Sequence, residues 1–100
     1  MSCYVVGQLK ISDVETYKQY MAGFLKMFKG YDGKVLAVDD APKVVEGEWD
    51  YSRLAIIEFA SKAEAERWYS SDAYQQISRD FRWVSSSGPL LMAESWNPKI

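Results

Sequence analysis

The sequence predicts an α+β fold with ferredoxin-like βαββαβ topology, in which a four-stranded antiparallel sheet carries its helices on one face. Three observations predict it. Four segments rich in aliphatic, aromatic and β-branched residues alternate with two helical regions in the order β-α-β-β-α-β. Each helical region opens on a Ser-x-x-Glu capping motif. Two β-α-β units with right-handed crossovers give the strand order 4-1-3-2 and place both helical regions on the same side.

The first strand is expected over Cys3–Ile11, where side chains alternate between two faces. The capping motif Ser12-Asp13-Val14-Glu15 then predicts a helix that ends at Gly30 or Gly33. The apolar residues of this helix recur at spacings of three and four, which is typical of a helix that buries one stripe. They are Val14, Tyr17, Met21, Phe24, Leu25 and Phe28.

The second half of the chain predicts strands over Lys34–Asp39, Arg53–Phe59 and Leu90–Trp96. The segment between the first two, Asp40–Ser52, contains Pro42 and is expected to be a strand extension or an irregular loop. The capping motif Ser61-Lys62-Ala63-Glu64 opens a short helix that ends at Tyr69. A further helix follows from Ala73 to Val84, and residues 85–89 connect it to the last strand. The buried face of this further helix is predicted to carry Tyr74, Ile77, Phe81 and Val84.

The composition of the chain limits the number of domains, the partners and the chemistry that it can have. The 100 residues suffice for a single domain, residues 1–100, and are too few for two. The net charge of -2 offers no basic surface, so we expect neither a nucleic-acid partner nor a membrane partner. The chain has no histidine, which excludes Ser-His-Asp and Cys-His nucleophiles and His-ligated metal or haem. We therefore expect no metal and no cofactor. One cysteine and no visible leader predict a cytoplasmic protein.

Both faces of the predicted sheet are apolar. The first strand turns Cys3, Val5, Gly7, Leu9 and Ile11 toward the helices, and we assign Ala55, Ile57, Phe59, Leu91 and Ala93 to the same side. The opposite face is predicted to carry Tyr4, Val6, Gln8, Leu54, Ile56, Glu58, Leu90, Met92 and Glu94.

Four strands present a face of roughly 300 Å² in projection. Covering such a face is worth up to about 8 kcal/mol at ~25 cal/mol per Å². The sequence therefore predicts a homodimer in which two sheets face each other. The alternative is a monomer whose Asp40–Ser52 segment folds across the face.

Seven short stretches of the chain, spread over nearly its whole length, resemble the small bacterial proteins grouped as domain of unknown function 1330. The most specific of them is Arg53–Ser61, followed by the Trp-Tyr and Tyr-Gln pairs. The stretches are Tyr4–Gly7, Tyr17 with Tyr20, Tyr31–Leu36, Val45–Trp49, Arg53–Ser61, Ala65–Tyr69 and Tyr74–Gln75.

The resemblance implies the dimeric α+β barrel superfamily, in which two ferredoxin-like sheets close into one barrel. It implies no single activity, because the same scaffold carries cofactor-free monooxygenases, haem-degrading enzymes, haem peroxidases and lactone isomerases. The chain departs from the family pattern at three places. Asp32-Gly33 replaces Gly-Gly, Asp39-Asp40-Ala41 replaces Arg-Gly-Gly, and Ala93-Glu94-Ser95 replaces Val-Glu-Gly. If the arginine after the second strand binds an anionic ligand in relatives, that contact is missing here.

The predicted outward face places a few polar groups among apolar ones, which is the usual composition of a small-molecule site. Two carboxylates in a dry cleft have raised pKa values and can act as acid and base. Alternatively, the glutamates lie at the rim and pair with Arg53, Lys10 or solvent. The candidate ligand-binding residues are Tyr4, Gln8, Arg53, Glu58, Met92 and Glu94.

The other charged residues have two interpretations each. Arg53, Arg79 and Arg82 either bind an anionic group or form surface ion pairs with acids such as Asp72 and Asp80. The pair Asp39-Asp40 either holds a divalent cation or forms a turn. Cys3 is expected to be a buried, inert thiol.

Two functional hypotheses remain open. In the first, the protein binds a small molecule between sheet and helices or inside the dimer barrel, with or without cofactor-independent enzyme activity on an aromatic or polyketide-like substrate. In the second, it is a non-catalytic accessory or stress-related protein whose barrel interior is filled by its own side chains. The volume of the interior cavity distinguishes the two.

Overall fold

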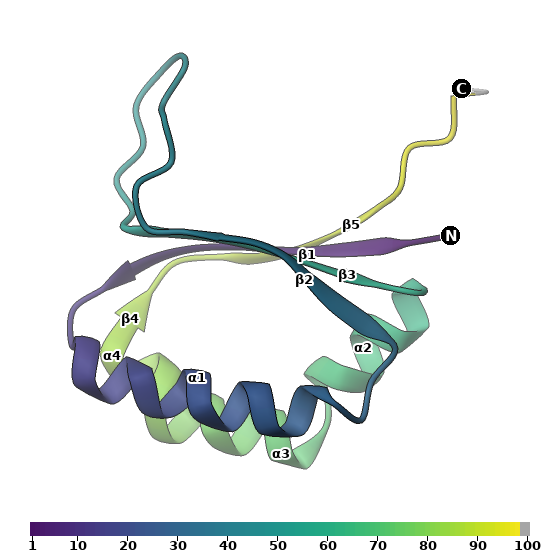
Figure 1. Ribbon diagram of the computed structural model, residues 1–100, viewed down its shortest axis with the longest axis horizontal. Helices are drawn as coiled ribbons and strands as arrows, with labels where there is room; N and C mark the ends of the chain where they lie inside the picture. The colour runs from purple at the N-terminus through teal and green to yellow at the C-terminus, as the bar shows by residue number, and fades with distance from the viewer. Residues whose placement is uncertain (99–100) are drawn as a thin grey trace.

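The computed structural model describes residues 1–98 and has the predicted ferredoxin-like α+β architecture. The long strands lie in the order β2-β3-β1-β5, all antiparallel, and every helix lies on the same side of the sheet (Figure 1). Because β5 is the fourth long strand in the chain, this is the predicted order 4-1-3-2. The elements are β1 (Cys3–Ile11), α1 (Val14–Phe28), β2 (Gly33–Asp39), β3 (Arg53–Phe59), α2 (Lys62–Tyr69), α3 (Asp72–Ile77), the π-helical turn η1 (Ser78–Arg82), α4 (Trp83–Ser85), β4 (Ser86–Ser87) and β5 (Leu90–Glu94).

Helix α1 begins one residue later than its capping motif predicted. The N-cap is Asp13, whose carboxylate accepts a hydrogen bond from the Thr16 backbone N–H at 3.2 Å. The Ser12 hydroxyl instead donates to the Ser85 carbonyl at 3.1 Å, which ties the end of β1 to α4. The buried stripe is also shifted. Tyr17, Tyr20 and Phe24 face the sheet, whereas Val14 and Leu25, predicted to be buried, are exposed.

The helical run after α2 contains a π turn that the sequence pattern did not predict. The Trp83 backbone N–H donates to the Ser78 carbonyl, five residues earlier, so η1 holds one residue more than an α-helical turn. The extra residue rotates the following side chains about the helix axis. Arg82 and Ser85 consequently face inward, and Val84, predicted to be buried, is 65% exposed.

The register of β5 differs by one residue from the prediction. Met92 lies opposite Val5 and Leu90 lies opposite Gly7, so Leu90, Met92 and Glu94 belong to the helix-facing side rather than the outer side. Leu91 and Ala93 take the outer side, since a slip of one residue exchanges all side chains of a strand. The Gln8 backbone N–H donates to the Pro89 carbonyl at 3.1 Å, and this bond sets the register at the start of β5.

The segment between β2 and β3 is an irregular loop, one of the two predicted alternatives. Figure 1 shows it standing away from the sheet on the side opposite the helices, as does the segment after β5. The Trp49 indole N–H donates to the Gln8 side-chain carbonyl at 2.9 Å and anchors the base of the loop. The loop therefore does not fold across the sheet, and the outer face has no helix over it.

The core consists largely of aromatic side chains between the helices and the sheet. Trp68, Tyr74 and Phe59 are almost completely buried, and the Trp68 ring centre lies 4.1 Å from that of Tyr74 and 5.1 Å from that of Phe59. This cluster joins α2, α3 and β3. None of the helices in residues 1–98 combines the length and the apolar composition needed to cross a bilayer.

The capping motif of α2 is only half formed. Ser61 accepts from the Glu64 backbone N–H as predicted, at 3.1 Å. The Glu64 carboxylate turns away from Ser61, accepts from the Asp32 backbone N–H at 2.8 Å and binds Arg67 at 2.8 Å. The Arg67 guanidinium in turn lies 4.3 Å from the centre of the Tyr31 ring. Glu64 therefore connects α2 to the turn that precedes β2.

Glycine is required at position 88. The residue has φ of +130°, and a Cβ there would lie 1.9 Å from the Gln8 carbonyl oxygen. We expect Gly88→Ala to lower the free energy of unfolding by more than about 2 kcal/mol, since backbone strain and a clash add. The control is Gly47→Ala, where φ is +87° but no atom lies within 4 Å. Urea denaturation of both variants checks this, and equal midpoints would contradict it.

Glu64 gives a prediction for acid stability. Its hydrogen bonds to Arg67 and to the Asp32 backbone lower its pKa to about 2. A lowered pKa stabilises the folded state above the ordinary value of 4.5, and this stabilisation disappears as the pH falls toward 2. When the pH is lowered from about 5 to about 2, the melting temperature of Glu64→Gln should therefore fall less than that of the wild type. Glu66→Gln, an exposed change on the same helix, should behave as the wild type does.

Candidate ligand-binding cavity

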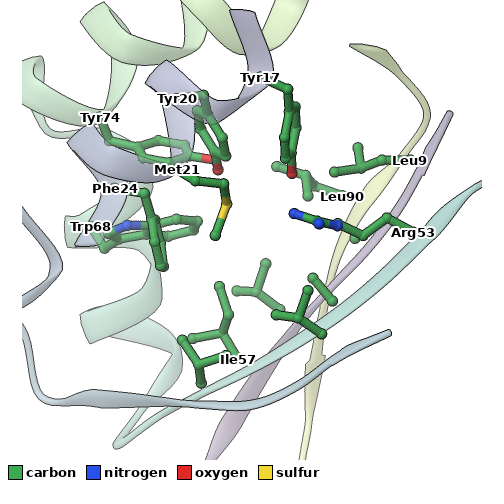
Figure 2. A pocket seen from close by; sticks show the side chains of 15 residues that line it. Leu9, Tyr17, Tyr20, Met21, Phe24, Arg53, Ile57, Trp68, Tyr74 and Leu90 are labelled. Carbon is green, nitrogen blue, oxygen red and sulfur yellow. The ribbon is translucent and has the colours of Figure 1, made fainter. Parts of the chain in front are cut away.

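A cavity lies between the sheet and the helical layer, with a volume of about 40 Å³. Figure 2 shows its lining side chains turned toward a common space from both layers. The helices provide an aromatic roof and the strands an aliphatic floor. The roof consists of Tyr17, Tyr20 and Phe24 from α1, Trp68 from α2 and Tyr74 from α3, with Met21 between them; the floor consists of Val5, Gly7, Leu9, Val35, Val38, Ala55, Ile57 and Leu90.

The cavity exists because large roof residues face small floor residues. Gly7 of β1 and Ala55 of β3 lie opposite each other in the sheet register, under the roof. Ala55 carries only a methyl group, whereas the Leu90 side chain lies over Gly7, where a Cβ would be 3.0 Å from Leu90 Cδ2. On β2, the helix-facing residues Val35 and Val38 are 39% and 44% exposed, so no helix covers this edge of the floor. The apolar floor therefore continues from the cavity to the surface along β2.

Arg53 is the charged residue of the cavity lining. Its guanidinium binds Asp40 through two hydrogen bonds, Nε to Oδ1 at 2.5 Å and Nη2 to Oδ2 at 2.9 Å. It also lies 5.2 Å from the centre of the Tyr17 ring. The hydrogen bonds from Arg53 lower the pKa of Asp40, and those to Asp40 raise the pKa of Arg53. Both groups are thus charged at neutral pH. The two hydrogen bonds to one carboxylate fix the orientation of the guanidinium.

Two phenol groups form the other polar feature of the cavity. The hydroxyls of Tyr20 and Tyr74 lie 2.8 Å apart and share one hydrogen bond. Burial raises the pKa of Tyr20 well above its ordinary value, and burial raises that of Tyr17. Tyr20 and Tyr17 are therefore protonated near neutral pH. One hydroxyl hydrogen of the pair has no acceptor in the part of the chain that the structure describes, so it is free to donate to a guest.

A wider groove of about 360 Å³ adjoins the cavity, between the first half of α1, the end of β1 and the start of β3, with Asp40 after β2 at its edge. Cavity and groove share Tyr17, Met21 and Arg53 as lining residues. These three side chains form the boundary between the two spaces. A flat apolar ring with a polar substituent fits such an arrangement, since the roof and floor are apolar and the polar groups lie at defined points.

The structure does not bring the six predicted ligand-binding residues together. Tyr4, Gln8 and Glu58 share the outer face, as expected, since Tyr4 lies opposite Glu58. Met92 and Glu94 lie on the other side because of the register of β5. The predicted pair of converging carboxylates, Glu58 and Glu94, is therefore wrong as a placement. Of the six, Arg53 lines the cavity.

The structure also places the acidic pair, the cysteine and the two other arginines that the sequence singled out. Asp39 accepts from the Ala41 backbone N–H at 2.9 Å, which is a turn, and Asp40 binds Arg53. No cluster of three or more potential metal ligands occurs within residues 1–98. Cys3 is completely buried, and burial raises the pKa of its thiol. Arg79 is exposed. Arg82 is buried and makes no ion pair with any described residue, so the predicted surface ion pair is wrong for Arg82.

Sequence reasoning assigned the roof aromatics to the core and so missed their role in lining a cavity. Helical periodicity cannot separate the two, because a cavity wall and a core share one apolar stripe. Two signals were present. Gly7 and Ala55 interrupt otherwise bulky strands, and three of the roof residues are tyrosine where phenylalanine would fill a core without a hydroxyl.

Solved structures share this fold. The RPA0582 protein of unknown function from Rhodopseudomonas palustris superposes with a TM-score of 0.77 at 14% identity, covering 97% of this chain and 84% of that one. SnoaB, a cofactor-independent oxygenase from Streptomyces nogalater, gives 0.69 at 10% identity, with 96% and 94% coverage. HapK from Hahella chejuensis gives 0.56 at 11% identity, with 96% and 93% coverage. Identities this low establish the fold alone.

No curated protein matches the sequence. A family model does, however, and it supports the resemblance that the sequence motifs indicated. The model matches residues 2–94, from the start of β1 to the end of β5, which includes every element that lines the cavity. The chain belongs to the family known as Domain of unknown function (DUF1330).

Proposed function

We propose that the protein binds a small, largely apolar molecule with an aromatic ring in the cavity between its sheet and helices. The observation that carries this proposal is the mismatch between five roof aromatics and the Gly7–Ala55 floor. Domain interiors are normally packed to the density of organic crystals, and gaps are few. A gap bordered by rings on one side is suited to another ring, which stacks on aromatic faces or against their edges.

The volumes indicate how a ligand is accommodated. The cavity of about 40 Å³ is smaller than a benzene-sized guest requires, and the adjoining groove of about 360 Å³ is larger. Met21 lies at the boundary, and its flexible side chain can move aside at small cost. The ring of the ligand enters past Met21, and the remainder of the molecule stays in the groove beside Arg53 and Tyr17.

The same site suits a cofactor-independent enzyme, and one comparison favours this extension. SnoaB is described as a cofactor-independent oxygenase and has the same fold over 96% of this chain. This is an argument from fold analogy. A protein with a filled interior and no ligand remains the competing function, and a binding measurement separates it from both forms of the proposal.

Ligand binding is tested with N-phenyl-1-naphthylamine, an uncharged probe whose fluorescence rises in apolar sites. We expect saturable enhancement with the wild type and at least about ten-fold weaker binding with Ala55→Phe, because the added ring fills the space above the floor. Ala22→Phe on the exposed side of α1 is the matched control and should bind normally. No enhancement with the wild type, or equal affinity of both variants, would refute the proposal.

We also propose that the protein is a homodimer joined through the outer faces of its sheets. This face carries Val6, Leu54, Ile56 and Leu91 and has no helix over it. The described residues extend 44 by 36 by 16 Å, the shape of a single sheet-and-helix bilayer. The loop between β2 and β3 stands out on the same side and would reach along a second copy. We further expect it to reside in the cytoplasm, where a lone buried cysteine remains reduced.

The dimer is tested with Val6→Glu, which places a charge at the centre of the outer face. We expect light scattering to give twice 11.5 kDa for the wild type and 11.5 kDa for the variant, because a buried unpaired carboxylate opposes association. Leu25→Glu, on the exposed side of α1, should remain dimeric. A wild type that is monomeric at micromolar concentration would exclude the dimer.

A further inference from the structure

Arg82 is a buried cation without a counter-charge. Its side chain is 6% exposed, and no carboxylate of residues 1–98 pairs with it. Its Nε is fully buried and has no hydrogen-bond partner among those residues. An arginine cannot relieve this by losing its proton, because the guanidinium stays charged in proteins. The rings of Tyr20, Tyr74 and Trp83, whose centres each lie 5.9 Å from the guanidinium carbon, give it cation–π contacts but no counter-charge, so the burial leaves the positive charge unbalanced.

The π turn produces this burial. It turns Arg82 inward and leaves the aliphatic Val84 exposed, the reverse of what folding stability alone would favour. Turns of this type are rare and are frequent at functional sites. The helix therefore gives up regular α-helical hydrogen bonding at the point where it directs a cation into the interior.

The surroundings of Arg82 offer hydroxyl groups but no paired carboxylate among the described residues. Its guanidinium carbon lies 5.9 Å from the ring centres of Tyr20 and Tyr74, which both line the cavity. The phenol pair holds one spare hydroxyl hydrogen. Ser78 Oγ, in the same π turn as Arg82, is likewise buried without a partner among the described residues, and so is Nε1 of Trp68, which lines the cavity. Unpartnered donors near a cation fit an anionic oxygen acceptor.

We propose that the ligand of this cavity is an aromatic carboxylate, whose charge is balanced by Arg82 and whose oxygen accepts a hydrogen bond from the Tyr20–Tyr74 pair. This rests on the proposed binding function. The ring occupies the space above Ala55, beside Leu90, and the carboxylate lies at the end of the cavity nearest the phenol pair. Arg53, the other cation near the cavity, is already bound to Asp40 and serves the entrance.

The test compares 2-naphthoate with 2-naphthamide, two probes of the same shape that differ in charge. Each is titrated at neutral pH as a competitor of N-phenyl-1-naphthylamine. We expect the carboxylate to bind at least about ten-fold more tightly, because a charge-assisted hydrogen bond is worth about that factor. Equal affinities in a wild type that binds the neutral probe would overturn the carboxylate proposal and leave the binding function standing. A wild type that does not bind the neutral probe would remove both.

Variants then locate the charge. Arg82→Met should abolish the preference for the carboxylate and leave neutral-probe binding intact, and it should raise the melting temperature, because an unpaired buried charge is removed. Arg79→Met, an exposed change in the same turn, should alter neither the preference for the carboxylate nor the melting temperature. Tyr20→Phe keeps the ring and should weaken the preference, which preserves the test if Arg82→Met does not fold. A preference that survives both Arg82→Met and Tyr20→Phe but disappears in Arg53→Met would place the anion at the entrance and overturn the proposal.

Discussion

The aromatic cluster between the helices and the sheet is the contact on which the rest of the structure depends. Trp68 lies at its centre, against Tyr74 at 4.1 Å, Phe59 at 5.1 Å and Phe24 at 6.2 Å between ring centres. These rings come from four separate elements, so they hold three helices and a central strand in one arrangement. Rings are large and stiff, and they keep the helices at a distance from the sheet that small residues cannot span. The cavity above Gly7 and Ala55 follows from that distance.

The two faces of the sheet thereby acquire different roles. The helix-facing side carries the cavity, and its uncovered edge along β2 gives access to it. The outer side faces away from the cavity and carries apolar residues. It is therefore suited to association with a second flat surface. Because side chains alternate along each strand, one set of strands serves both purposes without conflict. A charge on the outer face at Val6 and a bulky residue on the inner face at Ala55 therefore affect separate properties, although β1 and β3 are adjacent strands.

The fold could be predicted from the sequence to the level of strand order, because alternation and capping motifs are local signals. The bounds of β1 and β3 agree with prediction, and the loop between β2 and β3 is one of two expected alternatives. The site could not be predicted as well. Met92 and Glu94 were placed on the wrong side, since the bond from the Gln8 N–H to the Pro89 carbonyl sets the register there. Val84 was placed inside, since periodicity assumes 3.6 residues per turn and a π turn does not obey it.

The same π turn explains why the charges of the cavity could not be assigned from spacing. Arg79 and Arg82 stand three apart and would share one face of a regular helix. In the structure one is exposed and the other is buried. Arg53 lies beside the roof residue Tyr17, and Arg82 lies beside Tyr20 and Tyr74. The first cation is neutralised by Asp40, which lies at the surface and can separate from it. The second has no carboxylate partner among the described residues, and its guanidinium carbon lies 5.9 Å from the ring centres of two tyrosines that line the cavity. A neutral ligand would leave that charge unbalanced, whereas an anion would convert it from a source of instability into a binding contact.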